Sequence, residues 1–133
     1  MKIITLNTWG GKIYKELIDF LNKNRDIDIF CFQEILKGGK GQTSRGEMKS
    51  LYEDISNIFT DYFGYFSEYG EGGYYSENSK DLDFKYGIAC FIKKVINNLS
   101  LKVSPYTTTE GNGVIMMVDL PQGRRLLSQF QIM

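Results

Sequence analysis

The sequence predicts a mixed α/β (α+β) domain, and three observations lead to that class. Lys12 to Asn24 carries apolar residues at helical spacing between two apolar segments that resemble strands. After Phe63 the chain is dominated by short strand-like segments, so sheet outweighs helix in its second part. A length of 133 residues suits one domain with a real core, and no internal repeat is visible. We therefore assign residues 1–133 to a single domain.

The first two strand-like segments end in polar side chains. One begins at Lys2 and ends at Asn7, and the other runs from Asp28 to Gln33 and Glu34. A strand, a helix and a second strand within about thirty residues form a crossover unit, which usually places its strands parallel and close together. Asn7 and Glu34 should then lie at the same end of neighbouring strands. A carboxylate and an amide oxygen suit Mg²⁺, so the sequence predicts half of a magnesium site there.

The later elements follow from local signals. Ser44 and Glu47 have the spacing of a capping box, which predicts that a helix begins there. A glycine-rich loop precedes this helix, and a polar loop at Gly70 to Asp83 is too poor in aliphatic residues to pack. The segments that we expect to form strands are Phe63–Tyr69, Phe84–Lys93, Leu99–Ser104, Gly113–Leu120 and Arg125–Phe130, with a turn at Pro121 to Gly123.

These motifs resemble the endonuclease/exonuclease/phosphatase superfamily. Members open with a strand ending in Asn, here Asn7, and follow a helix with a strand ending in Gln-Glu, here Gln33 and Glu34. The segment from Tyr86 to Lys94 is similar to the family's Gly-led strand that closes with a basic residue. The resemblance covers Met1 to Lys94. It implies the N-terminal half of a four-layer α/β/β/α sandwich, and therefore a single partial domain over residues 1–133.

The resemblance also implies a chemistry. Glu34 would be the direct Mg²⁺ ligand, with Mn²⁺ as a possible substitute, and Asn7 would support the metal or the phosphate. The substrate would be a phosphodiester or phosphoester. Nucleic-acid, phosphoinositide and sphingolipid hydrolases all share this N-terminal pattern, so the substrate class stays open. With only two protein ligands, we expect the cation to be weakly held.

Two motifs of the family are missing from this sequence. Neither a Gly-Asp-x-Asn segment nor a terminal Asp-His pair occurs, and the chain contains no histidine at all. We therefore expect that this chain alone is inactive and represents a truncated form of a phosphoesterase. The alternative is a non-catalytic module that keeps the scaffold. Half of a sandwich should also leave one apolar sheet face uncovered, open to a protein partner or to self-association.

Charge and cysteine usage set further bounds. Sixteen basic residues balance sixteen acidic ones, so no overall field attracts a polyanion. Two cysteines within apolar strands make no disulfide framework, and we expect both to be buried thiols. The sequence contains no signal peptide and no apolar run long enough to span a bilayer. We therefore expect a cytoplasmic protein without a transmembrane segment.

Two residues near the predicted site have open roles. Trp9 could stack on a base or a sugar, and we interpret it instead as an aromatic lid over the core. Gln33 could orient Asn7 or satisfy backbone groups. Because successive side chains of a strand alternate, we expect Gln33 and Glu34 to point to opposite faces of the sheet.

Overall fold

The computed structural model describes residues 1–69, 83–96, 100–108, 111–119, 123 and 125–131. The predicted loop at residues 70–83 falls almost wholly outside the described residues, and so does most of the predicted turn at residues 121–123. None of the described helices is long and apolar enough to span a membrane. The helices and strands are β1 Ile3–Asn7, α1 Tyr14–Lys23, β2 Ile29–Lys37, α2 Leu51–Ile58, β3 Tyr62–Glu68, β4 Lys85–Lys93, β5 Ser100–Thr108, β6 Gly111–Asp119 and β7 Arg125–Gln131.

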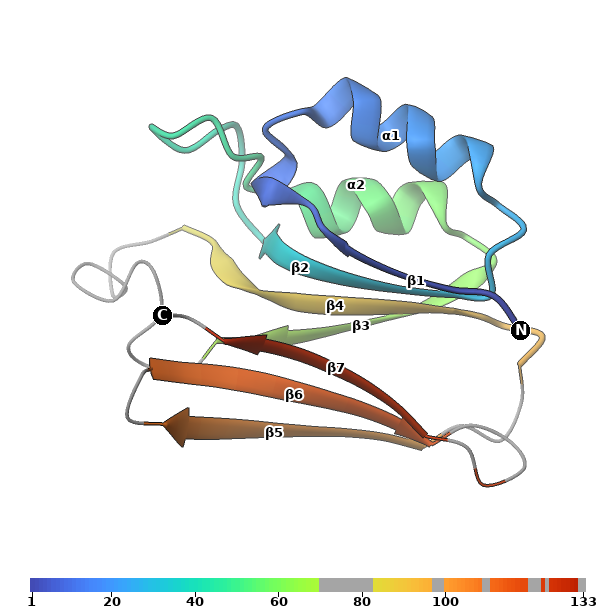
Figure 1. Ribbon diagram of the computed structural model, residues 1–133. Helices are drawn as coiled ribbons and strands as arrows, with labels where there is room; N and C mark the ends of the chain where they lie inside the picture. Colours follow the sequence, from blue (N-terminus) through green and yellow to red (C-terminus); the bar gives the residue numbers. More distant parts are fainter. Residues whose placement is uncertain (70–82, 97–99, 109–110, 120–122, 124, 132–133) are drawn as a thin grey trace.

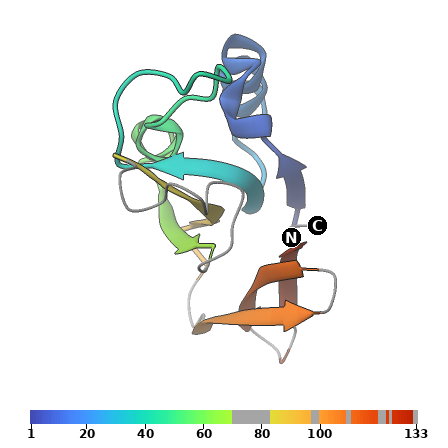
Figure 2. The ribbon, with the colours of Figure 1, turned by 90° about the vertical axis from the view of Figure 1, so that its left-hand side faces the viewer.

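The strands form two sheets. The first has the order β1-β2-β4-β3, in which β1 and β2 are parallel and the other two pairings are antiparallel. The second is an antiparallel meander of β5, β6 and β7. Figure 1 shows α1 and α2 on one side of the four-stranded sheet and the three-stranded sheet on its other side. Figure 2, seen from the end, shows the same three layers.

The parallel pairing of β1 and β2 confirms the predicted crossover unit, and β2 has the composition that its central position requires. Residues of β2 alternate between the two faces of the sheet. Phe30 and Phe32 pack beneath the helices together with Leu17, Leu51 and other apolar side chains. Ile29 and Cys31 lie on the opposite face in a second apolar cluster, with residues that include Cys90 and Ile92 of β4. A strand buried on both faces is expected to be continuously apolar.

The face that half a sandwich is expected to leave uncovered does not lie between the two sheets. The face of the four-stranded sheet that turns away from the helices is closed, because Ile29, Cys90 and Ile92 are fully buried. Figures 1 and 2 show that the three-stranded sheet covers this face, and β6 contacts β3. Within the described part of the chain, both helices pack on the four-stranded sheet. The sheet face that no described helix covers is thus the outer face of the three-stranded sheet.

The capping-box prediction is also wrong. Helix α2 begins at Leu51, seven residues after Ser44, and it has no side-chain cap. Glu47 lies instead in a small turn, closed by a bridge between Gln42 and Met48, where its carboxylate accepts a hydrogen bond of 2.5 Å from Thr43. Ser44 and Glu47 have the spacing of a capping box, but they lie in a turn that precedes the helix and not at the first residues of the helix.

Candidate metal and phosphate site

The candidate site lies where the parallel pairing of β1 and β2 ends. Asn7, the last residue of β1, is paired with Gln33 of β2. Beyond this point the chain turns away from the sheet in a short 3-10 turn at Trp9–Gly11, while β2 continues to Lys37. Glu34 is therefore the first residue of β2 beyond the parallel ladder, and it lies inside a strand that we had expected to end there.

A β-bulge determines how Glu34 is presented. Gln33 and Glu34 together lie opposite a single residue of β4, because Phe32 pairs with Ala89 and Ile35 with Gly87. Glu34 has a left-handed backbone, with φ 56°. For a residue with a side chain this conformation costs about 1–2 kcal/mol relative to right-handed φ. Bulges and strained residues of this kind concentrate at functional sites, where they redirect a side chain.

The bulge contradicts one expectation about this strand. Gln33 donates a hydrogen bond from Nε2 to Thr5 Oγ1 at 2.9 Å, and Glu34 Oε1 accepts one from Asn7 Nδ2 at 3.0 Å. Thr5 and Asn7 are two positions apart on β1 and so share a face of the sheet. Gln33 and Glu34 therefore reach the same face, because the extra residue of the bulge cancels the usual alternation.

The structure brings Asn7 and Glu34 together, as the crossover spacing predicted. The amide of Asn7 is held at both ends: Nδ2 donates to Glu34, while Oδ1 accepts a hydrogen bond of 2.8 Å from the backbone N–H of Trp9. In this arrangement Asn7 orients the carboxylate of Glu34, and its oxygen is already used. A role for Asn7 as a direct metal ligand stays a prediction.

Thr8 holds the backbone of the bulge in β2 through hydrogen bonds. Its side chain is buried, and its hydroxyl lies 2.9 Å from the carbonyl oxygens of both Gln33 and Glu34. Its backbone N–H donates to the Gln33 carbonyl at 3.1 Å. Sequence reasoning missed this residue, since a threonine between Asn7 and Trp9 gives no sign that it will anchor a bulge on another strand.

Tyr69 is a second residue that the sequence did not point to. Its ring is buried on the face between the two sheets and packs edge-on against Tyr86, with ring centroids 4.9 Å apart. Burial raises the pKa of the Tyr69 hydroxyl, and the nearby charge of Glu34 adds to the rise. Tyr69 thus belongs to the apolar cluster on the face of the four-stranded sheet that the second sheet covers.

The site offers few further ligands. Among the described residues, no three His, Cys, Asp or Glu side chains come close enough together to hold a metal ion, and none of the ion pairs involves Glu34. The donor set that fits a hard cation is therefore one oriented carboxylate, with the remaining positions left to water or to substrate. Such a site fits Mg²⁺ chemically, because this ion keeps several waters in many proteins.

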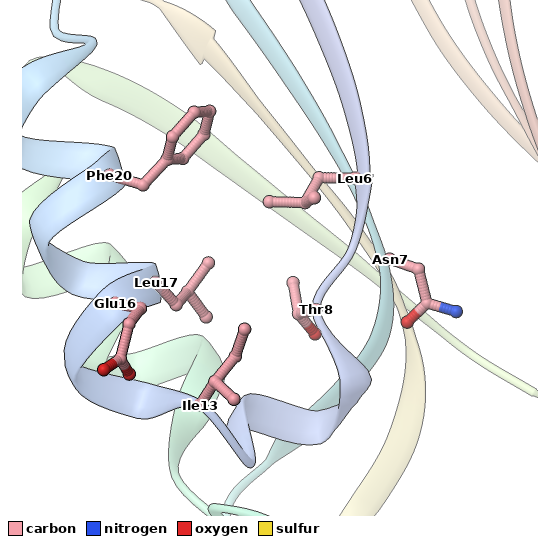
Figure 3. A pocket seen from close by; sticks show the side chains of 7 residues that line it. All are labelled: Leu6, Asn7, Thr8, Ile13, Glu16, Leu17 and Phe20. Atoms are coloured by element: carbon pink, nitrogen blue, oxygen red, sulfur yellow. The ribbon is translucent and has the colours of Figure 1, made fainter.

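A small pocket of about 160 Å³ lies beside this strand end, between β1 and α1. Leu6, Ile13, Leu17 and Phe20 give it an apolar lining. Figure 3 shows that Leu6 and Thr8 point into the pocket, whereas Asn7 points away from it. Asn7 thus helps to line the pocket, but its side chain, which is bonded to Glu34, points away from it.

Trp9 does not have the lid role that we favoured from the sequence. Its side chain is 57% exposed, and the Nζ atom of Lys12 lies 5.2 Å from the centroid of its ring. Its backbone is left-handed, with φ 52°, and the two glycines that follow it are left-handed as well. Trp9 and Glu34 are the only residues other than glycine with positive φ in the described part of the chain.

No protein-family model and no curated protein matches the sequence significantly. Solved structures do resemble the fold. An endonuclease/exonuclease/phosphatase family protein from Leptotrichia buccalis C-1013-b matches the whole chain with a TM-score of 0.54 and 18% identity, over 55% of that protein's own length. The human Nocturnin catalytic domain, solved with a bound sulfate anion, matches 90% of the chain with a TM-score of 0.44 and 16% identity, over 40% of its length. The chain therefore has the fold of the endonuclease/exonuclease/phosphatase proteins and spans about half the length of the Leptotrichia buccalis protein.

Proposed function

We propose that this chain is the metal-binding part of a Mg²⁺-dependent phosphoesterase. The observation that carries the proposal is the hydrogen bond between Asn7 and Glu34, which orients a carboxylate on a strained bulge at the end of a parallel strand pair. The fold shared with an endonuclease/exonuclease/phosphatase protein supports it. Glu34 would hold Mg²⁺ or Mn²⁺, and Asn7 would keep its carboxylate in place.

The bound cation would supply positive charge to a phosphoryl oxygen and to a leaving group. The contribution of Asn7 and Thr8 is to hold the strand end in place. The Glu34 carboxylate then needs no rearrangement when a ligand binds. Attack on a phosphate also needs a positioned nucleophile and a group that stabilises the developing charge. The sequence contains no histidine, and none of its aspartates occurs in a motif that would supply these groups.

Cation binding tests the site directly. We expect the chain to bind Mg²⁺ with a dissociation constant of about a millimolar or weaker, because one carboxylate leaves most of the octahedron to water. In NMR titrations with Mn²⁺, the amide signals of Asn7 and Glu34 should broaden first. Glu34→Gln keeps the size of the side chain and should abolish this selective broadening, while Glu53→Gln, a carboxylate on α2, should leave it unchanged. Broadening that is equal in the wild type and in Glu34→Gln would contradict the site.

Hydrolysis tests the activity. The isolated chain with Mg²⁺ or Mn²⁺ should show no turnover of plasmid DNA, RNA or bis-p-nitrophenyl phosphate above that of Glu34→Ala. Any coding sequence that continues beyond Met133 should restore turnover when it is expressed with the chain, and Glu34→Gln should remove this turnover. If the chain binds no cation and every longer form of it is also inactive, the result would support a non-catalytic binding module instead.

A further inference from the structure

The backbone conformation at Trp9 is one that glycine adopts more readily than tryptophan does. Trp9, Gly10 and Gly11 have consecutive φ values of 52°, 62° and 75°. Glycine adopts this conformation without cost, whereas a residue with a Cβ atom is strained in it. The hydrogen bond from the Trp9 N–H to Asn7 Oδ1 ties this strained residue to the same amide that orients Glu34.

Burial does not explain the tryptophan either. More than half of its side chain is exposed, so it forgoes most of the hydrophobic gain that a large ring obtains in a core. Lys12 is its described ring partner, with Nζ 5.2 Å from the ring centroid, and this ammonium is itself paired with Glu47 at 3.9 Å. A cation held beside the ring restricts its movement and leaves the exposed part of the ring free for a ligand. A strained backbone and an exposed ring at the edge of a site together indicate a functional residue.

We propose that Trp9 stacks on a planar ring of the substrate, so that the phosphoester bound at this site belongs to a nucleotide or to the end of a nucleic-acid strand. This inference rests on the proposed function. Every nucleobase presents a π-face that stacks on an aromatic side chain. One sugar separates the base of a nucleotide from its phosphate. Because the Trp9 backbone is bonded to Asn7, which is bonded to Glu34, we assign the base to Trp9 and the phosphate to the Asn7–Glu34 pair.

The geometry disfavours the lipid alternative. The apolar pocket that could hold part of an acyl chain opens between β1 and α1, and Asn7 points away from it (Figure 3). An acyl chain in that pocket would lie on the side of Asn7 away from which its side chain, bonded to Glu34, points. Trp9 lies two residues after Asn7, its backbone N–H is bonded to the Asn7 amide, and that amide is bonded to Glu34.

The fluorescence of the protein tests the inference, because Trp9 is the only tryptophan of the chain. With EDTA present, AMP should quench this fluorescence in a saturable way, and ribose 5-phosphate, which has the phosphate without the base, should not. A response to ribose 5-phosphate equal to that of AMP would overturn the proposal. A response to dihexanoyl phosphatidylcholine with none to AMP would also overturn it, in favour of a lipid substrate.

Variants separate stacking from a structural role. Trp9→Gly should weaken AMP affinity, measured by ligand-observed NMR, about 5- to 150-fold, the range for loss of one stacked base. Its midpoint of urea unfolding should be no lower than that of the wild type, because glycine relaxes the backbone there. Trp9→Phe should stay within a few-fold of the wild type. Phe63→Ala removes another exposed aromatic ring, 47% exposed on β3, and should leave the affinity unchanged.

The outcomes also separate this inference from the proposed function. AMP binding that depends on Trp9, without any cation binding at Glu34, would support stacking and contradict the phosphoesterase. Cation binding at Glu34, together with AMP affinity that is equal in Trp9→Gly and the wild type, would support the site and overturn the stacking. A Trp9→Gly chain that loses AMP affinity and also unfolds at lower urea would overturn the inference, since it would show that the ring stabilises the fold.

Discussion

Glu34 combines a functional carboxylate with a backbone that favours glycine, and two substitutions can separate the two properties. Glu34→Ala and Glu34→Gly both remove the carboxylate and its hydrogen bond with Asn7. They differ in the left-handed conformation at φ 56°, which strains alanine and suits glycine. We expect Glu34→Gly to be more stable than Glu34→Ala by about 1 kcal/mol in the free energy of unfolding, measured with urea. An alanine variant of equal or greater stability would contradict the strained conformation.

Tyr62, the first residue of β3, connects this strand to the segment that precedes β2. Its hydroxyl donates a hydrogen bond of 2.5 Å to the Ile27 carbonyl and lies 3.2 Å from that of Arg25. Burial raises the pKa of Tyr62 to about 12 from the ordinary value near 10, with a further contribution from the charge of Asp61. The unfolded chain therefore loses this proton at lower pH than the folded chain.

The stabilisation from the Tyr62 hydroxyl should accordingly be complete below about pH 10 and disappear as the pH rises to about 12. Tyr62→Phe has no proton to lose at this position. The difference in unfolding free energy between the wild type and Tyr62→Phe should therefore shrink over this pH interval. Urea unfolding at several pH values measures it, and a difference that stays constant from pH 9 to pH 12 would contradict the shifted pKa.

At the scale of elements, β3 and β4 come together around a glycine. A Cβ atom on Gly87 would lie only 2.0 Å from the carbonyl oxygen of Ser67, which is backbone of the neighbouring strand and cannot rotate away. We expect Gly87→Ala to destabilise the fold by about 2 kcal/mol or more, as overpacking of a core does. Lys85→Ala, at an exposed position of the same strand, should change stability little. Urea unfolding compares the two variants.

The elements that the sequence predicted are those with a clear period. The 3.6-residue period of α1 and the apolar run of β2 were sufficient for the crossover unit, and strand positions after Phe63 were correct to within a few residues, because alternation and turn signals lie within each segment. The start of α2 was wrong because Ser44 and Glu47 satisfy a spacing rule while Thr43 and Gly10 decide where Glu47 packs. The bulge at Glu34 depends on Thr8 and on the register with β4. No local pattern contains that information.

At the scale of the whole molecule, the contact between the two sheets protects both cysteines. Cys31 and Cys90 are 2% and 0% exposed, and their Sγ atoms lie 3.9 Å apart beneath the three-stranded sheet. The hydrogen bond with the neighbouring Cys31 thiol, and burial after it, raise the pKa of Cys90. We expect both thiols to react with Ellman's reagent only as fast as the protein unfolds. A cysteine placed at Lys85, an exposed position, should react at once. Rapid reaction of the native thiols would contradict the cover by the second sheet.

The position of β1 has a consequence for how the chain behaves at high concentration. In the described part of the chain, β1 has β2 on one side and no strand on the other. Its sequence from Ile3 to Asn7 contains no charged residue and no proline, the side chains that usually prevent two such strands from joining between molecules. Ile3 is 41% exposed there. Concentrated samples should form oligomers reversibly by joining at β1, and Ile3→Lys should raise the concentration at which sedimentation first detects them.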